Sequence, residues 1–525
     1  MKNLEYDYVI IGSGFGGSVS ALRLSEKGYK VLVIEKGKWF KAEDFPKTNW
    51  NLKKWLWLPQ VGLQGFFKMT FLNHVTVLSG VGVGGGSLTY ANTLPVPKDE
   101  FFKSGSWSEL HNWKNILDPF YQTAYKMLGA VTNPKFDVAD LAIKQLAKDI
   151  GKEDHFEATK VAVYFGKAGK TVKDPYFNGK GPDRTGCVHC GACMTGCRYN
   201  SKNTLDKNYL YLAQQLGAKI IAEKEVINVL PINKEDGSDG YTVEYKSKLG
   251  KKLTGKITTK GIIFSGGVMG TVPLLLELKD ENLPRLSDKV GCNIRTNNES
   301  LLVMTSTKKK HKDYSKGIAI GSILHTDENS HLEPVRYGEG SSFFRALTIP
   351  TIHNKFVLFR LLGMFGIILK HPLRFLKTIF ARNYAKRTTV LLFMQTLDST
   401  LRMKRGSFTR MRTVTESGEK PNAFIPEALT LAKKFGKMVK AIPYANFTDV
   451  LLGSPTTAHI LGGAVMGEDD SVGVIDKECN VFGYKNMMVC DGSMISANPG
   501  VNPSLSITAI SEYAMSKVPN KEEQY

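Results

Sequence analysis

The chain has 525 residues, and its 70 Lys and Arg against 49 Asp and Glu give a formal net charge of +21. At 42% hydrophobic and 23% charged residues, the composition is typical of a globular protein and excludes a disordered chain. The length predicts about two to four core-forming units. No zinc-finger, helix-turn-helix or RNA-binding motif accompanies the positive charge, so no nucleic-acid partner is expected.

The chain starts with a pattern that does not resemble a targeting segment. Residues 1–11 carry Glu5 and Asp7 and run directly into an apolar strand pattern, without a signal-peptide cleavage site. The longest uncharged apolar stretch, residues 361–369, is far shorter than the ~20 residues that span a bilayer. We therefore expect a cytoplasmic protein, whose contact with a membrane would be peripheral, at the inner face.

Residues 6–35 have the pattern of a strand, a tight turn, a helix over residues 18–27 and a second strand. The turn reads GSGFGG at residues 12–17. Its first glycine permits the turn, its second lets a pyrophosphate approach the backbone, and its third allows close packing of helix on strand. Glu35, at the end of the second strand, is placed to accept hydrogen bonds from ribose hydroxyls. The pattern predicts a dinucleotide site on a Rossmann-like α/β domain.

A second glycine cluster, GVGVGGGS, occupies residues 80–87. A nicotinamide dinucleotide does not require it, whereas the large planar ring of a flavin can lie against backbone that carries no side chains. A flexible loop is the alternative, but the apolar residues on both sides indicate an ordered segment. The two clusters together favour a flavin.

Four cysteines, Cys187, Cys190, Cys193 and Cys197, have the spacing of a bacterial ferredoxin loop. However, Arg198 follows where that pattern has proline, and there is no second cysteine run. Three interpretations stay open: a 4Fe-4S cluster, a structural zinc held by four thiolates, or reduced thiols without metal. A cluster would make the protein a dehydrogenase that passes electrons to a partner acceptor.

Between the cysteine run and the C-terminal segment, the chain shows a helical pattern over residues 203–216, a strand over 219–229 and another strand over 261–265. Residues 356–380 are apolar but basic, and they lie in the segment 340–397, which contains no acid. Their basic residues are Arg360, Lys370, Arg374 and Lys377. One interpretation is a pair of interfacial helices on anionic lipid, with residues 50–67 as a second lip of the same entrance. The other is a buried helix with a solvated basic side.

The C-terminal segment contains AHILGG, CDGS and GVNPSLSITA. Asn502 before Pro503 is typical of a helix start, with Asn as N-cap and Pro at the first helical position. The positive end of that helix would stabilise a reduced flavin anion. Removing a hydride from a carbinol carbon is easier as the hydroxyl proton leaves, and a histidine such as His459 suits the transfer of that proton. A core histidine and a simple helix cap are the structural alternatives.

These motifs, with GIIFSGG at residues 261–267, resemble the GMC (glucose–methanol–choline) flavoprotein oxidoreductases, specifically their cholesterol-oxidase-like branch, over nearly the whole chain. The resemblance implies FAD and oxidation of a CH–OH group by hydride transfer to flavin N5, with His459 and Asn502 at the substrate hydroxyl. It also implies a bulky, sterol-like alcohol and oxygen as the acceptor. Glu333 in HLEPVRY resembles the active-site base of this branch. The alternative is a surface carboxylate paired with Arg336.

The resemblance also implies the residues that bind the cofactor. For the ADP half and the adenine they are Gly12, Gly14, Phe15, Gly16, Gly17, Glu35 and Val226. For the flavin and its ribityl chain they are Gly84, Gly85, Gly86, Ser87, Asp491, Gly492, Asn502 and Pro503.

Signals for the cofactor lie at both ends and in the middle of the chain. We therefore predict an α/β fold in which a Rossmann-like FAD-binding domain is interleaved with a substrate-binding domain, itself built on an antiparallel or mixed sheet with helices. The FAD-binding domain is expected over residues 1–100, 181–290 and 455–525, and the substrate-binding domain over 101–180 and 291–454. A basic, non-catalytic binding protein without flavin is a further alternative.

Overall fold

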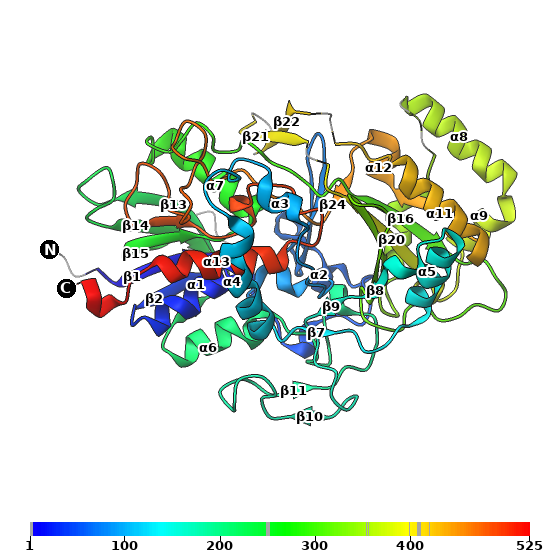
Figure 1. Ribbon diagram of the computed structural model, residues 1–525, viewed down its shortest axis with the longest axis horizontal. Helices are drawn as coiled ribbons and strands as arrows, with labels where there is room; N and C mark the ends of the chain where they lie inside the picture. Colours follow the sequence, from blue (N-terminus) through cyan, green and yellow to red (C-terminus); the bar gives the residue numbers. More distant parts are fainter. Residues whose placement is uncertain are drawn as a thin grey trace.

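The computed structural model describes residues 4–247, 253–352, 354, 356–397, 399–406, 411–418 and 421–524. Within this part of the chain, two seven-stranded sheets lie at opposite ends of an elongated molecule (Figure 1). The α/β fold with an additional antiparallel sheet, predicted from the sequence, is confirmed.

The first sheet has a parallel core. Its parallel strands are, in spatial order, β12 (Lys219–Ile221), β2 (Val31–Ile34), β1 (Tyr6–Ile11), β15 (Leu253–Phe264) and β25 (Met487–Val489). β14 (Tyr241–Ser247) and β13 (Lys224–Pro231) extend it in antiparallel fashion. The apolar residues of β1 and β2 are buried because helices cover the parallel strands.

The strand predicted over residues 219–229 is in fact two strands. β12 ends at Ile221, and Glu223 has a left-handed φ of 60°, which breaks the extended run. β13 then pairs with β14, at the other side of the sheet from β12.

Four helices pack together beside the parallel strands (Figure 1). They are α1 (Phe15–Glu26), α13 (Ser504–Lys517), α6 (Tyr209–Gln215) and α4 (Trp113–Met127). α1 lies between α6 and α13, so the first and last helices of the sheet share one core. α7 (Val268–Glu281) follows β15 and packs against β13.

The second sheet is antiparallel throughout. Its strands in spatial order are β19 (Thr348–Pro350), β23 (Pro443–Asn446), β16 (Ser300–Thr305), β20 (Thr388–Gln395), β18 (Ser330–Val335), β17 (Ser322–His325) and β8 (Phe156–Ala158). α5 (Val138–Asp149) and α11 (Pro426–Val439) pack on it and share its apolar core.

A small sheet brings the C-terminal segment beside the second glycine cluster. β24 (Thr456–Thr457) runs parallel to β6 (Thr76–Gly80), which pairs with β5 (Phe67–Phe71). β21 (Thr400–Lys404) and β22 (Arg412–Ser417) form a separate pair.

The remaining elements connect these layers. The helices are α2 (Leu52–Trp55), α3 (Asp99–Lys103), α8 (Val357–Lys370), α9 (Pro372–Ile379), α10 (Tyr384–Arg387) and α12 (Phe447–Leu452). The strands are β3 (Trp57–Leu58), β4 (Leu63–Gln64), β7 (Val131–Thr132), β9 (Lys160–Val161), β10 (Thr171–Val172) and β11 (Arg184–Thr185). Across the described residues, no helix is both long and apolar enough to cross a bilayer.

Candidate active site

The first glycine turn joins β1 to α1 at the carboxyl end of the parallel sheet. A Cβ at Gly16 would lie 1.7 Å from the Cys490 carbonyl oxygen, so only glycine fits this position. At Gly14 the nearest atom would be 3.9 Å away. Gly14 is also the N-cap of α1, and no side chain in the described part of the protein caps that end. The amino end of α1 is therefore open to an anion such as a pyrophosphate.

The second glycine loop lies directly against the first. Gly84 and Gly85 have φ values of 99° and 51°, and a Cβ at Gly85 would lie 2.7 Å from the Gly14 Cα. The Ser87 hydroxyl fixes this loop: it donates to the Gly84 carbonyl at 2.7 Å and accepts from the Leu205 N–H at 3.1 Å. The two loops form a continuous backbone surface, which fits the flat ring and pyrophosphate of FAD.

Glu35 lies at the end of β2 and is buried. Its Oε2 accepts from the Ser13 N–H (3.1 Å) and hydroxyl (2.7 Å), and its Oε1 accepts from the Gly37 N–H (2.8 Å). Burial raises the pKa of this carboxyl, and these hydrogen bonds act against the rise. A carboxylate offers about four acceptor positions, so one remains for a ribose hydroxyl. The Lys224 N–H donates to the Glu35 carbonyl at 3.0 Å, which brings β13, and with it Val226, close to Glu35.

Asp491 accepts hydrogen bonds from two segments beside the site. Its Oδ2 accepts from the Gly267 N–H (2.8 Å) and the Thr271 hydroxyl (2.5 Å), and its Oδ1 accepts from the Ser493 N–H (2.8 Å) and hydroxyl. Burial raises the pKa of Asp491, and these donors favour its charged form. Since protein donors take its acceptor positions, Asp491 holds the turn after β15 against residues 492–494.

His459 and Asn502 meet, although they are 43 residues apart in the chain. His459 follows β24 and Asn502 precedes α13, and 3.3 Å separates His459 Nε2 from Asn502 Nδ2. The prediction that Asn502 caps this helix is wrong. α13 begins at Ser504 with Pro503 as N-cap, and none of the described side chains caps it. The carboxamide of Asn502 is directed at His459 instead.

Two other asparagines hold this loop in place. Asn297 Nδ2 donates to the Val501 carbonyl at 2.7 Å, and Asn498 Nδ2 donates to the Leu397 carbonyl at 2.8 Å. They fasten the loop before α13 to the segments before β16 and after β20 of the antiparallel sheet. Asn502 is thereby placed between α13, which packs beside the parallel sheet, and the segments that flank β16 and β20 of the antiparallel sheet.

Glu299 is a site residue that the sequence did not reveal. It immediately precedes β16, is buried, and its Oε1 lies 3.0 Å from His459 Nδ1. It also accepts hydrogen bonds from the Thr457 hydroxyl and the Ala458 N–H. A carboxylate beside Nδ1 favours the tautomer with its proton on that nitrogen. The Nε2 lone pair then faces the Asn502 amide, which is a donor.

Glu333 lies on β18 and is fully buried. Burial raises its pKa to about 8, the Glu299 carboxylate adds to the rise, and the Asn502 side chain acts against it. Neither Glu333 oxygen, nor Asn502 Oδ1, has a hydrogen-bond partner among the described residues. Each buried polar atom left unpaired costs about 1–3 kcal/mol. Three such atoms on the neighbouring side chains of Glu333 and Asn502 indicate a place for a polar group of a ligand.

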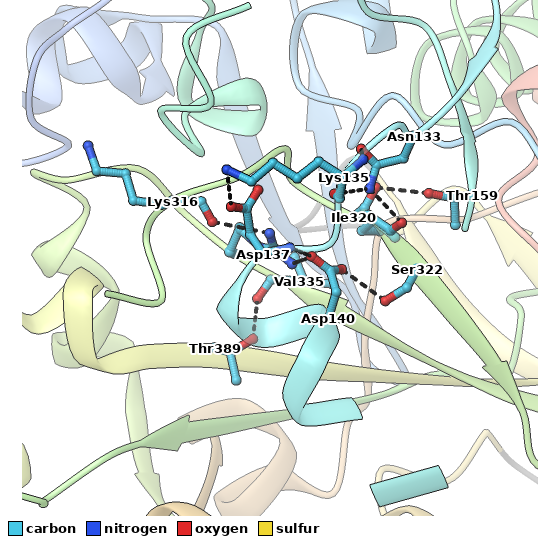
Figure 2. Close-up of polar contacts among 12 residues, drawn as sticks. Asn133, Lys135, Asp137, Asp140, Thr159, Lys316, Ile320, Ser322, Val335 and Thr389 are labelled. Atoms are coloured by element: carbon cyan, nitrogen blue, oxygen red, sulfur yellow. Dashed lines mark hydrogen bonds and ion pairs between the residues drawn. The ribbon is translucent and has the colours of Figure 1, made fainter. Parts of the chain in front are cut away.

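The alternative pairing of Glu333 with Arg336 is excluded. Arg336 Nη2 lies 2.7 Å from Asp140 Oδ2 in a buried ion pair, and Arg336 Nη1 donates to the Lys316 carbonyl at 3.1 Å. Figure 2 shows this network, in which Asp140 also accepts from the Ser322 hydroxyl at 2.9 Å. An odd spacing of three residues directs Glu333 and Arg336 to opposite faces of the sheet.

A cavity of about 500 Å³ lies beside β8 and β17 and is lined by residues that neighbour the site residues in the chain. Its lining includes Val501, the exposed Glu157 and the buried His331. His331 lies two residues before Glu333 on β18, and its Nε2 is 3.8 Å from Glu333 Oε1. Burial lowers the pKa of His331 to about 3, so this imidazole is neutral. His331 could not be predicted from the sequence, since a histidine in a strand resembles any core histidine.

The cysteine run does not form a metal site in the structure. Cys187, Cys190, Cys193 and Cys197 are free thiols around a narrow cavity that Lys202 also lines. In the described part of the chain, no group of three or more His, Cys, Asp or Glu side chains is arranged to hold a metal ion. Burial raises the pKa of the Cys187, Cys190 and Cys193 thiols, which disfavours the thiolates that a metal needs. The predicted 4Fe-4S or zinc site is therefore not supported.

Comparison with known proteins agrees with this geometry. The N-terminal and C-terminal models of the GMC oxidoreductases match residues 6–296 and 399–511. A cholesterol oxidase from Acinetobacter baumannii is 44% identical, over 100% of this chain and 97% of the relative. A cholesterol oxidase from Mycobacterium tuberculosis is 42% identical, over 99% and 92%. A long-chain-alcohol oxidase from Arabidopsis thaliana is 23% identical, over 98% of this chain and 67% of the relative.

Solved structures show the same fold. The pyridoxine 4-oxidase from Mesorbium loti superimposes with a TM-score of 0.61 at 14% identity, over 97% of this chain and 99% of that chain. The family expected from the sequence motifs is confirmed, and the electron-transferring alternative is not favoured. The chain belongs to the GMC oxidoreductases and is an FAD-dependent alcohol oxidoreductase.

Proposed function

We propose that this enzyme oxidises a bulky, apolar secondary alcohol of the sterol type to the ketone, with oxygen as the final electron acceptor. The support for this substrate is the similarity, at 42–44% identity over nearly the whole chain, to relatives named cholesterol oxidase. More distant relatives named long-chain-alcohol oxidase also point to a large apolar alcohol.

The FAD-binding domain, predicted over residues 1–100, 181–290 and 455–525, includes the parallel sheet and would carry the cofactor. Residues 12–17 and 84–87 would hold the pyrophosphate and the ring, and Glu35 would accept from the ribose. When bound, FAD supplies the acceptor for the hydride that leaves the carbinol carbon. The substrate-binding domain, predicted over residues 101–180 and 291–454, would cover the substrate with its antiparallel sheet, although α4 within this range packs with the helices of the parallel sheet.

One observation carries the proposal: His459 Nε2 lies 3.3 Å from Asn502 Nδ2, and among the described residues neither the Asn502 oxygen nor the oxygens of the nearby Glu333 have a hydrogen-bond partner. A substrate hydroxyl at this place would donate to His459 Nε2 and accept from Asn502 Nδ2. As the carbinol C–H bond breaks, the hydroxyl proton moves to Nε2. The Glu299 carboxylate beside Nδ1 stabilises the imidazolium that forms, as the orienting carboxylate of a catalytic triad does.

Glu333 supplies a second polar group, a neutral carboxyl, beside the reacting hydroxyl. Because burial raises its pKa to about 8, it holds a proton at neutral pH and adds no negative charge next to Glu299. A protonated carboxyl can donate a hydrogen bond to the carbonyl oxygen as it develops, and it keeps its proton while doing so.

The proposal is tested by flavin bleaching under nitrogen against sterols, long-chain primary alcohols and sugars. We expect fast bleaching with sterols, slower bleaching with long-chain alcohols and none with sugars. On admission of air, the flavin colour should return with one hydrogen peroxide per ketone formed. Bleaching by sugars alone would contradict the substrate, and reoxidation only by an added dye would contradict oxygen as the acceptor.

A further inference from the structure

The surface of the protein has one dominant concentration of exposed apolar side chains. Among the described residues, 23 large hydrophobic side chains are exposed, and 11 of them lie within residues 356–380. This segment forms α8 and α9, which a single residue, His371, separates. Isolated exposed apolar residues are normal, whereas a contiguous patch of this kind marks an interaction surface.

The exposed residues follow helical spacing. On α8 they include Leu358, Leu362, Phe365 and Leu369, which recur every three or four residues and so share one face. Leu373 and Phe380 continue the series at α9. Leu369, Leu373 and Phe380 are 79%, 69% and 74% exposed, which excludes the interpretation of this segment as a buried helix.

The opposite side of α8 is fixed to the body of the protein. Arg360 is buried; its guanidinium donates to the Asn354 and Leu451 carbonyls and lies 5.3 Å from the centre of the Phe424 ring. A Cβ at Gly363 would lie 2.2 Å from Ile352, so α8 also packs closely there. Figure 1 shows α8 at the outer margin of the molecule, beside α12. The apolar face is thus presented outward on an anchored helix.

The charge of this segment identifies the partner. Residues 340–397 contain no acid, and Lys370 and Lys377 are exposed beside the apolar face. A second copy of the chain would bring like charges together, whereas the headgroups of anionic lipids complement them. Basic side chains around an apolar helix face are the composition of helices that lie in a membrane interface.

A second apolar segment continues this surface. Arg345, which lies in residues 342–347, donates to the Ile379 and Ala381 carbonyls at the end of α9. The Trp50 indole donates to the Ser342 hydroxyl at 2.8 Å, and Trp50 itself is 50% exposed. Residues 342–347 therefore connect α9 to the predicted second lip.

We propose that α8 and α9 dock the enzyme on an anionic lipid bilayer, with the face of Leu362, Phe365, Leu369 and Leu373 in the interface and Lys370 and Lys377 at the headgroups. Docking requires neither turnover nor a bound alcohol, so it stands independently of the proposed substrate.

The test is sedimentation of the purified holoenzyme with vesicles of phosphatidylcholine, either alone or mixed with phosphatidylglycerol. We expect binding to the mixed vesicles that weakens with added salt, and far less binding to phosphatidylcholine alone. Lys370→Gln and Lys377→Gln should each weaken binding by about fivefold. Leu369→Ser and Leu373→Ser should each weaken it by about tenfold.

Matched controls are Leu216→Ser, which changes a 53% exposed leucine elsewhere, and Lys180→Gln on the loop between β10 and β11. Both should bind vesicles like the wild type, and all variants should keep the wild-type melting temperature. Equal binding of the wild type to both vesicles, or binding to neither, overturns the proposal. A wild-type dimer that Leu369→Ser dissociates without changing vesicle binding also overturns it, because a second copy would then cover this face.

Discussion

The two halves of the candidate site are built differently. The cofactor side is made of backbone, and its two glycine loops approach so closely that a Cβ at Gly85 would lie 2.7 Å from Gly14. The alcohol side is made of four side chains from four separate segments: Glu299, Glu333, His459 and Asn502. A backbone surface therefore fails where an added atom would meet neighbouring backbone, whereas a side-chain cluster keeps its shape under isosteric substitution and loses only its chemistry.

Two glycines of the first turn, Gly16 and Gly14, test this difference most directly. Gly16→Ala places a Cβ 1.7 Å from the Cys490 carbonyl oxygen, so α1 and the segment that follows β25 must separate. We expect a loss of about 3 kcal/mol or more in the free energy of unfolding, with little flavin retained. Thermal unfolding and the flavin-to-protein absorbance ratio measure both effects.

Gly14→Ala is the matched control, since its Cβ would meet no atom closer than 3.9 Å. This variant should fold with nearly the wild-type melting temperature, but it should bind FAD more weakly because the added methyl group occupies the open side of the turn. If Gly14→Ala retains flavin as the wild type does while Gly16→Ala unfolds, the open side of the turn is not the pyrophosphate site.

On the alcohol side, His459→Asn should leave the fold and flavin content unchanged. It removes the acceptor for the hydroxyl proton, and we expect kcat/KM to fall by about 10³. Anaerobic flavin reduction in a stopped-flow instrument measures the chemical step directly. His155→Asn, an exposed histidine, should behave as the wild type. A fall of less than about tenfold for His459→Asn would assign proton transfer to another group.

Glu299 is a positioning residue, because it acts through His459. Glu299→Gln keeps the shape but removes the charge 3.0 Å from His459 Nδ1. We expect kcat to fall by about tenfold to a hundredfold, with KM nearly unchanged, because the lost stabilisation concerns the imidazolium formed during the reaction. Glu299→Asp, which retains a carboxylate, should recover part of kcat. If Glu299→Gln changes KM and the melting temperature but leaves kcat unchanged, the role of Glu299 is merely structural.

The sequence predicted the cofactor side in more detail than the alcohol side, for a physical reason. The turn, the helix and Glu35 lie within 30 residues, and their spacing reflects contacts that local geometry enforces. Glu299 could not be found in this way, because its partner His459 is distant in the chain and comes close to it through tertiary pairing, such as that of Arg295 with Leu461. The local sequence around a glutamate that precedes a strand does not predict so distant a partner.

Local rules also failed where tertiary contacts override them. Asn502 has the sequence context of an N-cap, but Asn297 and Asn498 hold the preceding loop so that the helix begins at Ser504. The cysteine spacing is that of a cluster loop, yet spacing contains no information on burial, which here disfavours thiolates. For α8, only the exposed fractions distinguish a surface helix from a core helix.

The smallest expected effect concerns stability and the ionisation of Glu333. Its pKa is about 8 in the folded chain against an ordinary value of 4.5, so the unfolded chain releases this proton at lower pH. The unfolded state is therefore favoured increasingly as pH rises between these values, and the stabilisation from protonated Glu333 is lost above pH 8.

Glu333→Gln cannot ionise and should keep its stability over this range. We expect its melting temperature to exceed that of the wild type by about 2 °C or more above pH 8, and to differ less below it. The exposed Glu109→Gln is the control and should follow the wild type at every pH. Parallel pH curves for wild type and Glu333→Gln would show that Glu333 is ionised in the folded enzyme, and the alcohol side would then carry two adjacent negative charges that a bound hydroxyl must bridge.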